Sequence, residues 1–131
     1  MIYIFLSLNI LFGQFSSNVV HVDIISGPEK VEASIIFDEI IDRDDVSGWI
    51  DRDNYFTLSL FNVSLEKNNF SGNDYKYPLL SVEAADAGGS VQIIFNTANK
   101  IDSYQLIRHA KDKNLLVILN YSTKDEVPKE K

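Results

Sequence analysis

The chain has 131 residues, a formal net charge of −7 and no cysteine. This length predicts a single domain. The acidic charge disfavours binding to nucleic acid and to anionic lipid headgroups, because both carry phosphate. The absence of cysteine excludes disulfides, zinc–thiolate sites, a cysteine nucleophile and lipidation at cysteine.

The chain begins with an almost wholly apolar segment, Met1 to Gly13, that carries no charged side chain. It is shorter than the roughly 20 residues of a membrane-spanning helix, and mostly small polar residues follow at Gln14 to Asn18. This pattern predicts a secretory signal peptide at residues 1–17, and the alternative is an N-terminal core strand. Export without cysteine favours the periplasm or cell envelope of a bacterium, with no membrane contact after signal cleavage.

Alternating apolar and polar residues, typical of half-buried antiparallel strands, run through most of the remaining chain. Leu115 to Leu119 is apolar on both faces and predicts a central strand. Only Phe37 to Val46 shows a trace of helical spacing, which Asp and Arg soon dilute. The predicted fold class is therefore all-β, a sandwich of seven to eight mainly antiparallel strands. The predicted strands are 19–25, 31–37, 55–62, 79–84, 91–95, 103–109 and 114–121.

The strand pattern occurs twice, at an offset of about sixty residues. A short strand, a glycine turn and an alternating run at Val22 to Phe37 recur at Val82 to Phe95. Each copy closes on another alternating run, Tyr55 to Asn62 and Asn114 to Tyr121. Such a repeat predicts two similar sheets packed face to face. The predicted domain covers 18–122, with repeat halves 19–65 and 79–122.

Three segments interrupt the alternation. Asp42 to Asn54 is a charged connection around the single tryptophan, Trp49, and Glu66 to Pro78 joins the two halves. Residues 123–131 are charged and lack apolar anchors, which predicts a flexible tail or the start of a linker.

The order of strands in the second half, Ser90 to Phe95, Ser103 to Ile107 and Asn114 to Leu119, resembles that of the AMIN domain. Tyr55 to Leu65 is similar to the closing strand of its first half. This family is the N-terminal module of bacterial cell-wall amidases and type IV pilus secretins, and the resemblance covers nearly all of Val19 to Tyr121. It implies a non-catalytic periplasmic module that binds peptidoglycan glycan or an envelope protein, without a cofactor.

The residues themselves offer little for catalysis. The two histidines, His21 and His109, lie in predicted strands without a second histidine or cysteine at i+2 or i+4, and no Gly-x-Ser-x-Gly motif is present. We therefore expect no enzyme. A hydrolase, as a third hypothesis, would need a cleft with a perturbed carboxylate pair.

Glycan binding would use a flat aromatic side chain with amide and hydroxyl partners. Trp49 equally fits a cover over one end of the sandwich, and the strand residues equally fit an ordinary wet face. The candidate ligand-binding residues are Trp49, Asn54, Tyr55, Thr57, Ser59, Gln92 and Gln105.

Two alternatives stay open. The first is a structural or assembly sandwich that binds a protein partner by its sheet edges. The second is a calcium-dependent adhesion module with oxygens from Asp42, Asp44, Asp51 and Asp53. These carboxylates lack an EF-hand register, and a solvated loop with arginine counter-charges is the simpler interpretation.

Overall fold

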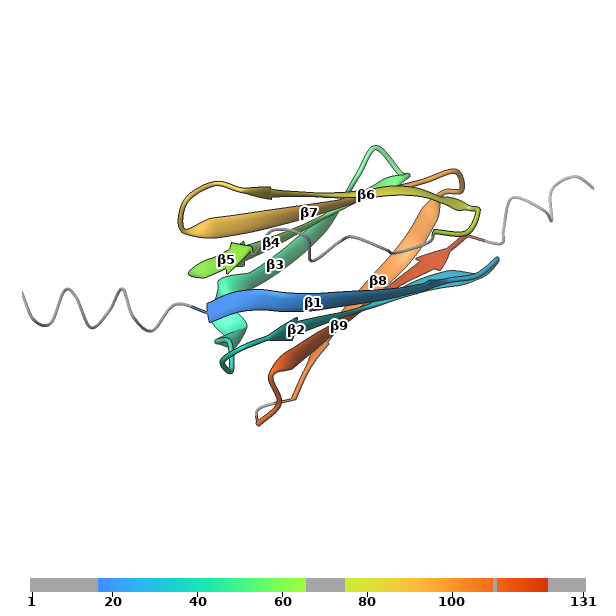
Figure 1. The fold of residues 1–131 in the computed structure, drawn as a ribbon. Helices are drawn as coiled ribbons and strands as arrows, with labels where there is room; N and C mark the ends of the chain where they lie inside the picture. The colour runs from blue at the N-terminus through green and yellow to red at the C-terminus, as the bar shows by residue number, and fades with distance from the viewer. Residues whose placement is uncertain (1–16, 66–74, 110, 123–131) are drawn as a thin grey trace, which may run out of the picture.

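The computed structural model describes residues 17–65, 75–109 and 111–122. Within these ranges the chain forms nine strands and one short 3-10 helix, arranged as two packed sheets (Figure 1). The elements are β1 Ser17–Ser26, β2 Lys30–Phe37, η1 Arg43–Asp45, β3 Val46–Asp51, β4 Tyr55–Phe61, β5 Val63–Leu65, β6 Leu79–Asp86, β7 Ser90–Thr97, β8 Ile101–Arg108 and β9 Asn114–Tyr121.

One sheet has the order β5-β1-β2-β9-β8 and the other the order β3-β4-β7-β6. All neighbouring strands are antiparallel except β5, which pairs in parallel with the start of β1. The predicted all-β sandwich of mainly antiparallel strands is confirmed, and β9 is a central strand as the sequence indicated.

The two repeat halves are interleaved between the sheets. The five-stranded sheet joins the β1–β2 hairpin of the first half to β8 and β9 of the second, and the four-stranded sheet makes the reciprocal exchange. The register irregularities match as well: β1 slips against β2 between Val19 and His21, and β6 slips against β7 between Leu79 and Ser81. Each of the two sheets contains strands from both halves, so the two halves share one core.

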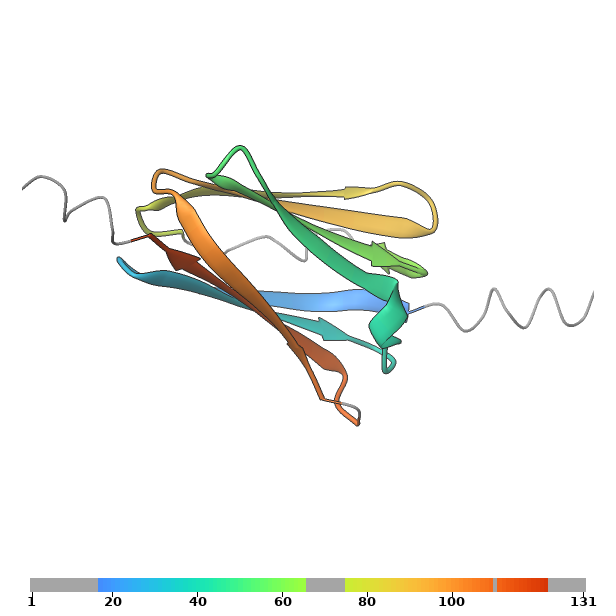
Figure 2. The same ribbon diagram turned by 180° about the vertical axis from the view of Figure 1, so that it is seen from behind.

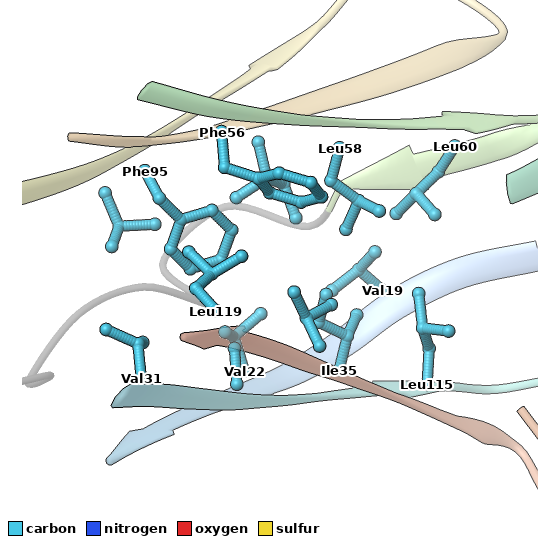
Figure 3. Packing of buried hydrophobic residues seen from close by; sticks show 14 of the residues in the cluster. Val19, Val22, Val31, Ile35, Phe56, Leu58, Leu60, Phe95, Leu115 and Leu119 are labelled. Carbon is cyan, nitrogen blue, oxygen red and sulfur yellow. The ribbon is translucent and has the colours of Figure 1, made fainter. Parts of the chain in front are cut away.

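Inward-facing residues of both sheets fill the space between the layers (Figure 3). Phe56 and Leu58 of β4 are fully buried, as are Ile35 of β2 and Leu119 of β9. The rings of Phe56 and Phe95 lie 6.1 Å apart between centroids. Each such side chain contributes about 1.5–3 kcal/mol by leaving water, so alternation along the strands explains the two-layer fold.

The sequence missed the strand β3, which lies inside the predicted charged connection Asp42 to Asn54. Its inward positions are Val46, Gly48 and Ile50, and the central glycine breaks the apolar alternation. The close packing explains this glycine: a Cβ at Gly48 would lie 2.6 Å from Cζ of Phe56.

Two smaller differences have local causes. The run predicted at 55–62 ends at Phe61, because Asn62 has a φ of 59° and separates β4 from the short strand β5. The weak helical spacing before Val46 corresponds to one 3-10 turn, in which the Asp42 side chain accepts a hydrogen bond from the Asp44 amide at 3.1 Å.

The predicted signal peptide and the predicted tail lie outside the described residues, except that Ser17 is the buried first residue of β1. Most of the connection between the halves, residues 66–74, is also outside them. In the part of the chain that the structure describes, no helix is long and apolar enough to cross a membrane.

Candidate functional site

The edge strands β3 and β8 lie side by side on one side of the sandwich (Figure 2). The hydroxyl of Tyr104 in β8 donates a hydrogen bond to the carbonyl of Gly48 in β3 at 2.8 Å. The Tyr104 ring lies 4.8 Å from that of Phe56, centroid to centroid. Nearby, the amide of Ile101 donates to the carbonyl of Asp53 at 2.7 Å. These contacts close one end of the junction between the two sheets.

The outer edge of β8 carries backbone groups that are not used by its sheet. The amide of Tyr121 donates to Glu29 at 3.0 Å, so the odd-numbered residues of β9 bond toward β2 and its even-numbered residues toward β8. Because backbone direction alternates along an antiparallel ladder, the even-numbered residues of β8 turn their N–H and C=O groups outward. These residues are Tyr104, Leu106 and Arg108.

The same reasoning applies to β3. The amide of Thr97 donates to Asn54 at 2.9 Å, so the odd-numbered residues of β4 bond toward β3. The backbone groups of Gly48 and Ile50 therefore point away from the sheet. Of these groups, only the Gly48 carbonyl has a hydrogen-bond partner among the described residues, the Tyr104 hydroxyl. Two partly unpaired edges thus share one side of the molecule.

Where β3 and β8 separate, toward η1, a groove of about 460 Å³ opens between them. Its walls combine apolar side chains with two arginines, one from η1 and one from the end of β8. The lining residues are Arg43, Val46, Leu106, Ile107, Arg108 and Leu115. The arrangement can hold an extended chain segment, with apolar contacts and positive charge on one side.

The opposite side of the sandwich is held together differently. The Ser26 hydroxyl and the Lys76 backbone exchange two hydrogen bonds of 2.9 Å, which tie the end of β1 to the segment before β6. Asp86 of β6 accepts from the amides of Gly88 and Leu65, and these hydrogen bonds hold the pKa of its carboxyl below the ordinary value. Glu83 adds a second exposed carboxylate to β6, and acidic edges discourage strand pairing with this acidic chain.

Five of the seven predicted ligand residues lie on the outer face of the four-stranded sheet, namely Trp49, Tyr55, Thr57, Ser59 and Gln92. Trp49 is opposite Thr57, and Ser59 is opposite both Ser47 and Gln92. Directly opposed residues share a face. Trp49 is 44% exposed, whereas Thr57 and Ser59 are only 9% and 3% exposed, so little of their hydroxyls is available to a ligand.

Tyr55 makes a separate contact at the end of this face, and the other two predicted residues lie elsewhere. Tyr55 lies at the start of β4, with the Arg52 guanidinium 4.7 Å from its ring centroid. Asn54 donates its side-chain amide to the Thr97 carbonyl at 3.1 Å and so supports the turn before β4. Gln105 lies on the outer face of the other sheet, opposite Ile118. The predicted set is therefore not one site.

The acidic residues proposed as calcium ligands also make separate contacts. Asp42 caps η1, and Asp51 lies 3.6 Å from the Nε of Arg52. Among the described residues, no group of three or more His, Cys, Asp or Glu side chains could hold a metal ion.

Sequence reasoning missed the groove, although β8 carried one signal of it. The inward-facing positions of this strand are Tyr104, Leu106 and Arg108. A charged residue therefore occupies the last position, where the alternation predicts an apolar one. The contribution of Arg43 could not be seen, because η1 and β8 are far apart in sequence.

Comparison with known proteins identifies no matching family model and no matching curated protein. Among solved structures, the chain is similar to heat shock protein 16.0 from Schizosaccharomyces pombe. The sequences are 19% identical, the match covers 80% of this chain and 75% of that chain, and the TM-score is 0.47. A similarity of this strength does not carry function from that protein to this one.

This comparison corrects the family prediction. No family model matches the chain, and the heat shock protein to which it is similar is not an AMIN domain, so the predicted membership of the AMIN family is wrong. Peptidoglycan targeting, which depended on that family, and the location in the periplasm or cell envelope, which the apolar first segment suggested, are contradicted as well. The physical reason for the error is that the quoted motifs were strand alternations, which many sandwiches share.

Proposed function

We propose that this chain is a non-catalytic β-sandwich that binds a protein partner through the side formed by β3 and β8. The observation that carries the proposal is the pair of neighbouring edge strands with outward backbone groups, joined by the Tyr104–Gly48 hydrogen bond. An extended segment added to such an edge gains main-chain hydrogen bonds, while pockets beside the edge select its side chains.

Several features support this side over the rest of the surface. The groove beside β8 provides apolar walls for alternate side chains of an added strand. The opposite edge, β6, carries Glu83 and Asp86, and the start of β1 is already paired with β5.

Site-specific photo-cross-linking tests the proposal in the cells that make the protein. A photoreactive side chain replaces the exposed residues Ser47 of β3 or Gln105 of β8, and, as matched controls, the exposed residues Ile25 of β1 or Leu80 of β6. We expect covalent adducts to a partner from the β3 and β8 positions and few from the controls. Adducts that arise equally from all four positions, or only from the controls, would contradict it.

A further inference from the structure

Two arginines of the groove have no carboxylate partner in the part of the chain that the structure describes. The ion pairs among the described residues are Lys30 with Glu32 and Arg52 with Asp51, so neither Arg43 nor Arg108 takes part in one. The chain has 19 acidic residues against 12 basic ones. In such an excess of carboxylates, two unpaired arginines that line the same groove leave a local positive region on an acidic protein.

Arg108 is the more constrained of the two. It occupies the last inward position of β8, opposite the buried Leu115. Its Nε is buried and has no hydrogen-bond partner among the described residues. A buried donor without a partner costs roughly 1–3 kcal/mol. The rest of the side chain is only partly buried and reaches the groove.

Two of the three acidic residues next to Arg43 make other contacts, and the third, Asp44, is exposed. The Asp42 carboxylate accepts from the Asp44 amide at 3.1 Å within η1. The Asp45 carboxylate faces the side-chain amide of Asn62, 3.4 Å away. None of the described residues that line the groove is acidic, so they leave its positive charge without a counter-charge.

We propose that the groove binds the side-chain carboxylate of an aspartate or glutamate in an extended partner segment that pairs with the free edge of β8. The carboxylate lies between Arg43 and Arg108. The apolar side chains two residues before and after it, which point to the same face of the extended segment, contact Val46, Leu106 and Leu115. Charge complementarity selects this occupant, since arginine forms its strongest hydrogen bonds with carboxylates. This inference rests on the proposed function and adds the chemistry of the partner.

The test uses short capped peptides of alternating valine and threonine that carry a fluorescent dye. The first has one central glutamate, the second has glutamine at the same place, and the third is the glutamate peptide with methylated backbone amides. Fluorescence anisotropy measures the affinity of each for the whole chain. We expect the glutamate peptide to bind about tenfold more tightly than the glutamine peptide. The methylated peptide should not bind, because it cannot pair with β8.

Matched variants locate the effect. Arg108→Met keeps the aliphatic contacts, and Arg43→Gln changes an exposed residue that is not expected to affect folding. Arg52→Gln removes the same charge at the far end of β3, where Arg52 interacts with Asp51 and Tyr55. We expect the preference for glutamate over glutamine to disappear in Arg108→Met, to fall about threefold in Arg43→Gln, and to remain in Arg52→Gln. Thermal unfolding of each variant confirms that it is folded.

The outcomes separate the two proposals. Equal binding of the glutamate and glutamine peptides, with loss of binding on methylation, would overturn the carboxylate site and leave the strand edge in place. A glutamate preference that survives both arginine variants would overturn it as well. Undiminished binding of the methylated peptide would instead contradict edge pairing and with it the proposed function. Absence of binding by every peptide at millimolar concentration would overturn the carboxylate site.

Discussion

The hydroxyl of Tyr104 donates to the carbonyl of Gly48 across 2.8 Å and so joins the edge strands of the two sheets. We expect Tyr104→Phe to lower the free energy of unfolding by about 0.5–1.5 kcal/mol, because the hydrogen bond is lost while the ring contact with Phe56 remains. Tyr104→Ala should cost more, since it also removes the ring 4.8 Å from Phe56. Urea denaturation measures both; a Phe variant as unstable as the Ala variant would contradict the assignment.

Gly48 should not tolerate a side chain. A Cβ there would meet Cζ of Phe56 at 2.6 Å and Cδ1 of Leu106 at 3.3 Å. Overpacking of this kind costs about 1–3 kcal/mol, so Gly48→Ala should lower the midpoint of thermal unfolding. Gly27→Ala is the control, because its nearest neighbour would be 3.9 Å away. Equal effects of the two substitutions would show that the close approach at Gly48 does not matter.

Tyr121 carries a buried hydroxyl with no hydrogen-bond partner among the described residues, and burial raises its pKa from 10.0 to about 12. Because the folded state favours the neutral phenol, its contribution to stability is complete below pH 10 and is lost as the pH rises toward 12. We expect Tyr121→Phe to be neutral or stabilising by about 1 kcal/mol at pH 7, and to reduce the loss of stability in alkali. Denaturant titrations at neutral and alkaline pH measure this; a strong destabilisation at pH 7 would reveal a missed partner.

Asp38 fixes the start of β1 through its carboxylate. The side chain and the backbone amide of Asn18 donate to it at 2.8 and 2.7 Å, and these bonds hold its pKa below the ordinary value of 3.8. A lowered pKa contributes stability above the unfolded value, and this contribution is lost as the pH falls through the folded value. We expect Asp38→Asn to destabilise the chain at pH 7 and to make no difference in strong acid.

The control for Asp38 is Asp23→Asn, which changes an exposed carboxylate in the same strand pair. Chemical denaturation at several pH values compares the two variants with the parent chain. A destabilisation by Asp38→Asn that persists unchanged at low pH would show that the effect is not electrostatic.

The fold class could be predicted because the alternation of apolar and polar residues that determines it lies within short stretches of sequence. Runs such as Val31 to Phe37 and Val91 to Phe95 alternate cleanly, and their inward residues are fully or almost fully buried. The duplicated pattern also predicted two similar sheets. It could not show that each sheet takes strands from both halves, since alternation states which face is buried and not which strand is the neighbour.

The candidate site could not be predicted from the sequence, for a related reason. Arg43 and Arg108 come from elements far apart in sequence, and only the packing of β3 beside β8 brings them to one groove. Trp49 drew attention because it is the single tryptophan, yet its neighbours Thr57 and Ser59 are buried by the sheet around them. Residue type suggested a ligand there, while burial, which the sequence does not show, removes most of the contact surface.

Amide hydrogen exchange, in the free chain and in a complex with the partner captured by cross-linking, tests the central claim most directly. We expect the amides of Gly48, Ile50 and Leu106 to exchange rapidly in the free chain, because they point away from their sheets. On binding, they should become protected, while the outward amides of Val82 and Ala84 on the opposite edge keep their rates. Protection of β6 alone, or of no edge strand, would contradict partner binding through β3 and β8.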